Sequence, residues 1–411
     1  MDITMTSKAT VREAGMIGDG VMALPHATWI SRRQLWVDIG APFLATRVAL
    51  LLVGWFARYF PPSPDYPLAD VVARGWQFSP HRLLDIWGRW DTGWYMTLIR
   101  EGYTVHGNLA QQQSNVTFFP LYPYLVRLLL WPIPHQWQSD GVILLVGVIL
   151  SNLFLLGGLL LLYLLTLELT HKTDVAQRTV LYLLLFPSAF FLSCFYTDVA
   201  FLFLSVAALY AAQRRAWAWA ALAAALLGIT RPLGVLIAPV LVWLYMSSVE
   251  WRIDKIRANF LWLLLTPLPF LLYLAWIGQA TGDFLAPVSA QQAFFRGFAW
   301  PWTTLLAPTK ANFLMTPLEQ FGVVLFLAVA VIACWRLPSA AYGLWVMALI
   351  LPPLFTGTMT SFLRYLVVMV PVFVVMAQWG ARPAIDRILQ TVMLALQVVL
   401  MVAWSQFYWV A

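Results

Sequence analysis

Long apolar runs separated by short polar stretches make up most of this 411-residue chain. A helix needs about 20 mostly apolar residues to cross the hydrocarbon core of a bilayer. Runs of about that length, some a little shorter, recur along the chain. The pattern therefore predicts an all-α fold: a polytopic membrane helix bundle of about 11 spans. The predicted spans are residues 39–60, 142–166, 179–195, 199–212, 216–230, 235–246, 259–277, 321–335, 340–355, 366–378 and 388–409.

The composition supports a lipid-embedded chain. Hydrophobic residues make up 61% of the sequence and charged residues only 10%, whereas soluble domains carry about a quarter charged residues. The net charge of +7 does not indicate a nucleic-acid partner, because Lys and Arg stand in short clusters between the apolar runs. The two cysteines lack metal-site spacing. The partner that this composition predicts is the lipid bilayer.

The basic clusters also predict an orientation. They fall on alternate sides of the predicted spans, and one assignment places all of them in the cytoplasm. This assignment predicts a multi-pass protein of the plasma membrane with its N-terminus inside. Residues 1–34 would form a mobile cytoplasmic tail and residues 35–411 a single transmembrane domain. Two long segments, 61–131 and 279–319, would then form outer loops that carry interfacial helices.

One apolar segment of the first outer loop does not fit a span. Residues 118–131 form a short segment for a span and contain two prolines and Arg127. If they crossed the membrane, the basic clusters could no longer all lie on the cytoplasmic side. We interpret them as an interfacial or re-entrant helix at the outer face. A true short span is the alternative. The second outer loop could cover a site at this face as a lid.

Tryptophans recur at helical spacing earlier in the same loop. Leu83, Trp87, Trp90, Trp94 and Leu98 would line one face of a helix. Such a helix is expected to lie along the membrane surface. At that depth an indole can place its apolar ring in the lipid and its polar N–H near water. Packing of this face on the bundle is the alternative.

Asp91 lies within that helical pattern and has two interpretations. It could be a helix N-cap or a partner of Arg89. It could also be a general base at the membrane surface that takes the proton of an attacking hydroxyl. A positioned base typically contributes about 10²–10⁴-fold to a rate.

Other charged residues fall at the same predicted outer level, next to or within apolar runs. These are Asp198, Arg231, Arg364 and Arg127. Charges at such depths are costly and rarely idle. The planar fork of arginine pairs two oxygens of an anion, so we predict anion binding by Arg364 first and Arg231 second. Snorkelling to lipid headgroups, or pairing with Asp198, is the alternative. Asp198 itself is equally a candidate N-cap or ion-pair partner.

Four stretches resemble, in the same order, the GPI alpha-mannosyltransferase family that adds the second mannose, and its bacterial relatives. They are WGRWDTGWYMTLIREGYTVHGN with TFFPLYPYLVRL, then FPSAFFLSCFYTDVAFLFLS, then Arg231 with Gly234, and FLRY near the end. In the first stretch the matching residues are Arg89, Trp90, Asp91, Gly102, Tyr103, Phe118, Phe119, Pro120, Leu121, Tyr122, Pro123 and Arg127. The resemblance covers about residues 40 to 400.

The resemblance implies a membrane glycosyltransferase of the GT-C type. Such enzymes take a sugar, here mannose, from a polyprenyl-phosphate carrier on the non-cytoplasmic side and invert the anomeric centre. The acceptor would be a glycolipid or another hydroxyl compound. Asp91 becomes the base. The substrate-binding residues are expected to be Arg364, Arg231, Asp198, Arg89, Trp90, Tyr122 and Arg127.

The chain departs from the family pattern at two places. Asp198 stands where the family usually has Glu, and His106 stands where an acidic residue often follows Gly-Tyr. A second carboxylate of a metal-binding pair is therefore not visible there. We predict no metal site and no cofactor, and a metal requirement stays open.

A transporter or lipid flippase is the alternative function, because its intramembrane Arg and Asp residues would line a pathway. Its sites should lie near the bilayer midplane on broken helices. The motif-bearing residues here gather at one face, around the first outer loop, which favours an enzyme.

Overall fold

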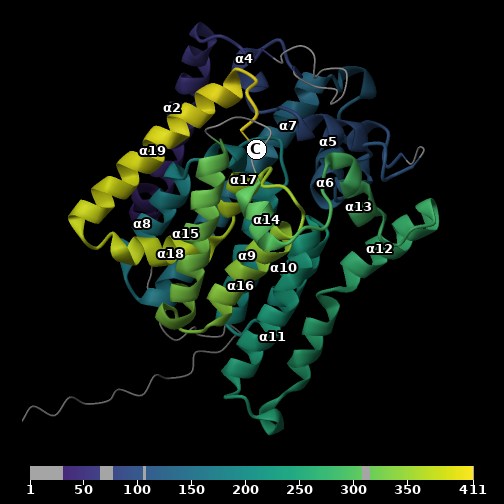
Figure 1. Ribbon diagram of the computed structural model, residues 1–411. Coiled ribbons are helices and arrows are strands. Elements are labelled where there is room, and N and C mark those ends of the chain that lie inside the picture. Colours follow the sequence, from purple (N-terminus) through teal and green to yellow (C-terminus); the bar gives the residue numbers. More distant parts are fainter. Residues whose placement is uncertain (1–30, 65–76, 105–107, 308–314, 411) are drawn as a thin grey trace, which may run out of the picture.

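The computed structural model describes residues 31–64, 77–104, 108–307 and 315–410. Within these ranges every regular element is a helix, so the predicted all-α class is confirmed. The helices form an elongated bundle (Figure 1). The α-helices are α1 (Arg32–Leu35), α2 (Ala41–Phe56), α4 (Arg82–Asp85), α5 (Asp91–Arg100), α6 (Leu121–Leu130), α7 (Asp140–Thr170), α8 (Thr173–Leu185), α9 (Asp198–Gln213), α10 (Trp217–Gly228), α11 (Ile237–Ser248), α12 (Leu268–Thr281), α13 (Ala286–Ser289), α14 (Pro301–Leu306), α15 (Met315–Arg336), α16 (Ala341–Leu354), α17 (Phe362–Leu366), α18 (Val370–Trp379) and α19 (Pro383–Ser405).

Short π and 3₁₀ turns extend or connect these helices. They are η1 (Trp36–Gly40), η2 (Ala57–Tyr59), η3 (Asn115–Thr117), η4 (His135–Trp137), η5 (Ala189–Leu192), η6 (Pro232–Leu236), η7 (Ile253–Lys255), η8 (Ala258–Leu265) and η9 (Ala290–Phe294). Residues 1–30 of the predicted tail 1–34 lie outside the described residues. Residues 31–34 form the N-cap and the first residues of α1.

Some of the helical stretches are long and apolar enough to cross a membrane, which indicates an integral membrane protein. Within the described ranges there are 5: Arg32–Tyr59, Asp140–Thr170, Ala258–Thr281, Met315–Arg336 and Pro383–Ser405. The other apolar helices have only 10–17 residues. The predicted number of about 11 spans is therefore not confirmed, although helices form in every predicted region.

Two predicted spans are interrupted at prolines. The run 179–195 is α-helical only to Leu185 and resumes as the 3₁₀ turn η5, because Phe186 precedes Pro187 and takes an extended conformation. The run 366–378 is split between α17 and α18, which begins one residue before Pro371. Both interruptions lie beside the charged residues described below, and they let the chain place polar side chains at the end of the bundle.

The predicted tryptophan helix is also broken. Helix α4 ends at Asp85 and α5 begins at Asp91, with Trp90 at a φ of 39°, a strained conformation for a residue with a Cβ. The side chain of Arg89 folds back over the break, where its Nη1 donates to the backbone oxygens of Asp85 and Gly88. Trp87 and Trp90 are buried, whereas Leu83 of the same face is 47% exposed, so much of this face packs on the bundle and its position at the membrane surface stays a prediction.

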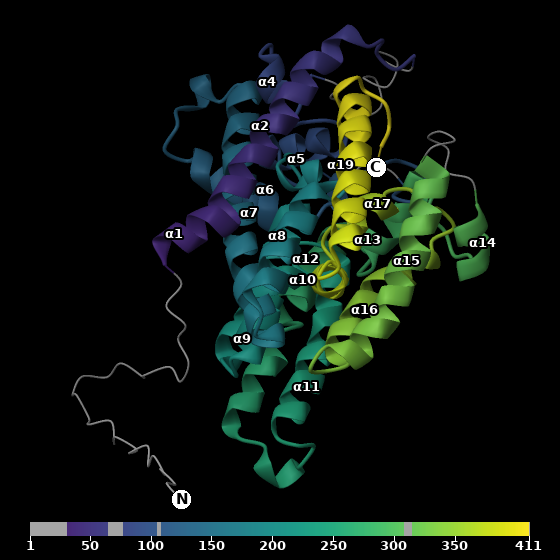
Figure 2. The same ribbon diagram turned by 90° about the vertical axis from the view of Figure 1, so that its left-hand side faces the viewer.

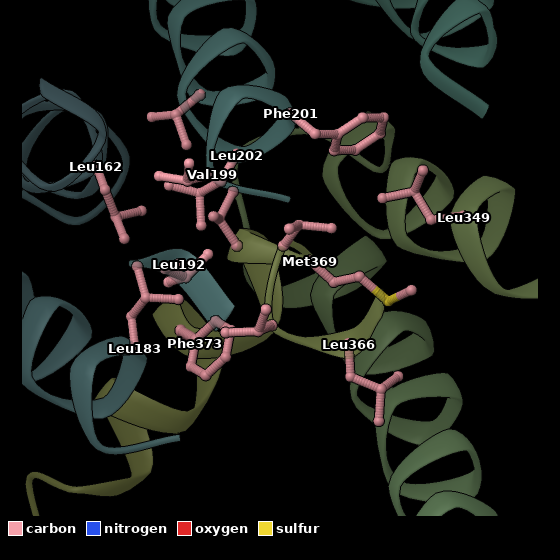
Figure 3. Close-up of a cluster of buried hydrophobic side chains, with 14 of the residues drawn as sticks. Leu162, Leu183, Leu192, Val199, Phe201, Leu202, Leu349, Leu366, Met369 and Phe373 are labelled. Atoms are coloured by element: carbon pink, nitrogen blue, oxygen red, sulfur yellow. The ribbon is translucent and has the colours of Figure 1, made fainter. Parts of the chain in front are cut away.

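The hydrophobic core lies where α7, α8, α9, α16, α17 and α18 meet. Figure 3 shows buried side chains that interlock there: Leu162, Leu183, Leu192, Val199, Phe201, Leu202, Leu349, Leu366, Met369 and Phe373. The close packing holds the first turn of α9 and the short helix α17 in one continuous core. Core packing therefore positions the charged residues at the ends of these helices.

The small helices gather at one end of the bundle. Figures 1 and 2 show α4, α5, α13, α14 and α17 toward this end, away from the connection between α11 and α12. Helix α19 packs on α2 and α8 and returns the C-terminal segment to the same end. Helix α6 has 10 residues, too few to cross a bilayer at about 1.5 Å per residue. Its interpretation as an interfacial or re-entrant helix stays a prediction.

Candidate active site

Asp91 and Asp198 each stand in the first turn of a helix. Asp91 begins α5, directly after the backbone reversal at Trp90, and Asp198 begins α9. The positive end of the helix dipole favours a carboxylate at both positions. Asp198 is fully buried, whereas the side chain of Asp91 keeps 21% of its surface exposed. One carboxylate is therefore enclosed by protein and the other remains accessible.

Arg231 reaches Asp198 from the break between α10 and η6. The backbone of Arg231 is extended because Pro232 follows it. Its Nη2 lies 2.5 Å from Asp198 Oδ2, and its Nε donates to Thr197 Oγ1 at 2.8 Å. Arg231 and Asp198 therefore form the ion pair that was the alternative interpretation of these residues. Arg231 also faces a cavity, so the pairing does not remove it from the site.

Arg364 joins the two carboxylates. Its Nη1 donates to Asp91 Oδ2 at 2.7 Å, and its Nε lies 3.7 Å from Asp198 Oδ1. Burial alone would lower the pKa of Arg364, but the charges of Asp198 and Asp91 raise it well above its ordinary value. The guanidinium therefore stays charged.

Tyr365 lies among arginines. Its hydroxyl accepts a hydrogen bond of 3.0 Å from Arg296 Nη2, and the guanidinium carbons of Arg231 and Arg364 lie 5.4 and 5.5 Å from its ring centre. Burial raises the pKa of Tyr365, but the charges of Arg296, Arg364 and Arg231 outweigh it and lower the pKa to about 8. Three guanidinium groups thus surround one tyrosine.

These side chains line a cavity of about 770 Å³. Its polar end is formed by Asp91, Thr197, Arg231, Gln291, Arg296, Arg364 and Tyr365. Its remaining wall is mostly apolar and includes Phe270, Leu274, Leu285, Val288, Leu349, Pro352 and Val368. A ligand that fills it would need both an anionic or polar group and an apolar part.

Four of the predicted substrate-binding residues do not line this cavity: Arg89, Trp90, Tyr122 and Arg127. Arg89 is buried, forms a 2.8 Å ion pair with Asp85 and stacks over Phe407. The hydroxyl of Tyr122 donates to Gly147 O at 2.9 Å, deep in the bundle.

The other two pack or project elsewhere. Trp90 packs edge-on against Trp404 and Trp409, with 4.9 Å between ring centres in both pairs. Arg127 is exposed on α6 beside Tyr124. Trp90 and Arg89 thus support the backbone turn that presents Asp91, without facing the cavity themselves.

Sequence reasoning missed the roles of Arg296 and Tyr365. Tyr365 was visible as the neighbour of Arg364 in the FLRY stretch, and Arg296 only as part of the predicted lid. His106 and residues 308–314 of the predicted lid lie outside the described residues. Within the part of the chain that the structure describes, no group of three or more His, Cys, Asp or Glu side chains could hold a metal ion.

The fold and site together define an all-α integral membrane protein with a cavity that has one charged end and an apolar wall. Residues 72–274 match the sequence pattern of the family described as Mannosyltransferase (PIG-V). The predicted resemblance to this family is thereby confirmed, and Asp91, Asp198 and Arg231 lie within the matched residues 72–274. No curated protein matches the chain in sequence.

Among solved structures, the chain is similar to the oligosaccharyltransferase of Archaeoglobus fulgidus. The apo form has 13% identity and a TM-score of 0.49, and the match covers 89% of this chain and 56% of that one. The complex of the same archaeal enzyme, AglB, with an inhibitory peptide and a dolichol-phosphate has 11% identity and a TM-score of 0.45, with coverages of 89% and 56%. The chain thus spans little more than half the length of these structures.

Proposed function

We propose that the protein is a membrane mannosyltransferase of the GT-C type. It would move mannose from a polyprenyl-phosphate carrier to an acceptor hydroxyl, with inversion, on the extracytoplasmic side of the membrane. The family match over residues 72–274 supports the transferase. The observation that carries the proposal is the convergence of Asp91, Arg231 and Arg364 at one end of a largely apolar cavity.

The arginines would receive the carrier phosphate. As the bond between the anomeric carbon and the phosphate oxygen breaks, negative charge develops on the departing lipid phosphate. Preorganised guanidinium groups stabilise such charge, and more so where water is excluded. Arg231 and Arg364 are held in place by their carboxylate partners, so little reorganisation is needed when the phosphate arrives.

Asp91 would act as the general base. Its Oδ2 is engaged by Arg364, which leaves Oδ1 outside that ion pair and available to an acceptor hydroxyl. The hydroxyl oxygen attacks the anomeric carbon from the side opposite the phosphate, and its proton passes to Asp91. The electron pair of the broken bond leaves with the phosphate. The acceptor hydroxyl and its base lie on one side of the sugar and the leaving phosphate on the other, so the anomeric configuration is inverted. The positioning of both substrates supplies much of the rate.

The apolar wall would hold the first isoprene units of the carrier. Phe270 and Leu274 of α12 and Leu349 and Pro352 of α16 line the cavity. Burial of apolar surface gives about 25 cal/mol per Å², so a few isoprene units contribute substantially to donor affinity. Binding energy of this kind, remote from the reacting bond, can be used to orient the sugar.

A transfer assay tests the proposal. The purified chain, reconstituted in liposomes with membrane lipid extract, would be incubated with polyprenyl-phosphate-mannose that carries a labelled sugar. Transfer of label to an acceptor, absent with Asp91→Asn, is the expected result. Movement of the labelled lipid between leaflets without product would instead support the transporter or flippase alternative.

A further inference from the structure

The segment after α12 connects two walls of the cavity. The backbone N–H groups of Gly297 and Ala299 donate to the oxygens of Thr356 and Phe355, both at 3.0 Å. These bonds fasten the segment to the turn that leads into α17. The segment that carries Arg296 is therefore tied to the helix that carries Arg364 and Tyr365.

The same segment also packs on the wall that carries Asp91. The ring of Phe294 lies 6.0 Å from Trp94 of α5 and 6.1 Å from Phe118, both measured between ring centres. Arg296 thus sits on a bridge between the α5 wall and the α17 wall. Both Phe294 and Arg296 line the cavity, so this bridge forms part of its wall.

Arg296 differs from the other two arginines of the cavity in its partners. Arg231 and Arg364 form ion pairs with Asp198 and Asp91. Arg296 instead donates to neutral oxygens, Gln291 Oε1 at 3.1 Å and Tyr365 Oη at 3.0 Å. Three guanidinium groups against two carboxylates leave one positive charge, and the pairing assigns it to Arg296.

An anion gains most from a cation that no acid has neutralised. Hydrogen bonds between charged partners are about twice as strong as neutral ones, so exchanging Tyr365 for a phosphate oxygen favours binding. A phosphodiester carries one negative charge, which equals the excess charge of the cavity. The planar fork of an arginine matches two phosphate oxygens.

We propose that Arg296 is a phosphate-binding residue of this cavity and supplies the charge that attracts the lipid phosphate of the donor. The proposal rests on the function proposed above. It adds a third arginine, contributed by the segment between α12 and α15. The chemistry recognised is a phosphate oxyanion, which could belong to the donor lipid, to a bilayer phospholipid or to free phosphate.

Direct binding tests this role without any transfer step. The full chain in nanodiscs would be titrated with fluorescent polyprenyl phosphate, and in parallel with the corresponding polyprenol. Arg296→Gln should weaken phosphate binding by about 10-fold or more, as for loss of a charge-assisted bond, and leave polyprenol binding unchanged. Arg296→Lys should fall between wild type and Arg296→Gln.

Arg252→Gln is the matched control. Arg252 is an exposed arginine in the connection between α11 and α12, paired with Asp254 and far from the cavity lining. The Arg252→Gln variant should bind polyprenyl phosphate with the affinity of the wild-type protein. Competition by phosphatidylglycerol or inorganic phosphate identifies the source of the oxyanion. Competition by either one as strong as that by polyprenyl phosphate would overturn a donor-specific site.

Two outcomes of the titration overturn the inference. Unchanged phosphate binding by a folded Arg296→Gln variant removes Arg296 from the phosphate site. Equal loss of phosphate and polyprenol binding makes Arg296 a structural residue of the bridge. If Arg296→Gln does not fold, Arg296→Met, which keeps the apolar stem, is judged by the same criteria. If the wild-type protein binds no polyprenyl phosphate, the proposed function itself is refuted. If the wild-type protein transfers mannose and the Arg296→Gln variant binds polyprenyl phosphate normally, only the inference about Arg296 is refuted.

Discussion

Arg364 Nη1 lies 2.7 Å from Asp91 Oδ2, although 273 positions separate the two residues in the chain. The same guanidinium approaches Asp198 Oδ1 at 3.7 Å. One side chain thus connects the proposed base with the buried carboxylate that holds Arg231. The proposed base and the proposed phosphate site are therefore physically coupled, and substitutions should report on that coupling.

Asp91→Asn removes the proton acceptor and keeps the shape of the side chain. We expect kcat for transfer to fall by about 10²–10⁴-fold, the usual contribution of a general base. Donor affinity should persist, because the amide oxygen can still accept from Arg364. Single-turnover transfer together with donor titration checks this, and near-normal turnover would remove Asp91 from the chemistry.

Arg364→Gln leaves Asp91 and Asp198 without their shared cation. Breaking a buried ion pair from one side typically costs about 3–5 kcal/mol, and we expect the lower part of that range because Asp91 is partly exposed. Thermal unfolding in detergent should shift down, and donor binding should weaken. Arg364→Lys keeps the charge and should recover part of both. An unchanged donor titration would place the phosphate elsewhere.

The pair of Asp198 and Arg231 allows a double-mutant cycle. Asp198→Asn should weaken folding, because the change removes the acid that is 0% exposed and leaves Arg231 without its partner. In the double variant with Arg231→Gln no charge is left unpaired. We expect a coupling energy of about 1–3 kcal/mol from the unfolding midpoints. Strictly additive effects would mean that the pair does not stabilise the site.

Donor binding should depend on pH through Tyr365. Its pKa is lowered to about 8 by the charges of Arg296, Arg364 and Arg231, against the effect of burial. Below that pH the hydroxyl is neutral and the excess positive charge is available to a phosphate. Above it the tyrosinate neutralises that charge, so donor affinity should fall as pH rises through about 8.

Tyr365→Phe serves as the control for this pH effect. The variant has no group that ionises at this position, so its donor affinity should stay level across the same range. The carboxylates of Asp91 and Asp198 are also near the cluster, and both variants retain them. A wild-type profile that matches the Tyr365→Phe profile would exclude Tyr365 as the titrating group.

Gly147→Ala tests the packing behind the site. A methyl group at Gly147 of α7 would collide with the ring of Phe195. The backbone N–H of Phe195 donates to Trp87 O at 2.9 Å and so supports the turn before Asp91. Overpacking of a core costs about 1–3 kcal/mol. We expect a lower unfolding midpoint, whereas Gly282→Ala, where no atom lies within 4 Å of the added group, tests backbone strain alone.

The sequence by itself determined the class of the protein and pointed to several residues of its candidate site. Hydropathy is a local property, so the apolar runs predicted an all-α membrane bundle. The motifs and charges at the ends of those runs predicted Asp91, Asp198, Arg231 and Arg364, which the structure brings together. A charged residue at the end of an apolar run can be recognised from the sequence alone as a candidate functional residue, because placing its charge near lipid is costly.

Only the tertiary structure decided which side chains meet. It broke the predicted tryptophan helix at Trp90, turned Arg89 and Tyr122 into the bundle, and brought Arg296 to Tyr365. Contacts between distant segments depend on how helices rotate and pack against one another. Hydropathy and helical spacing give the apolar face of a helix but not the partner that covers it.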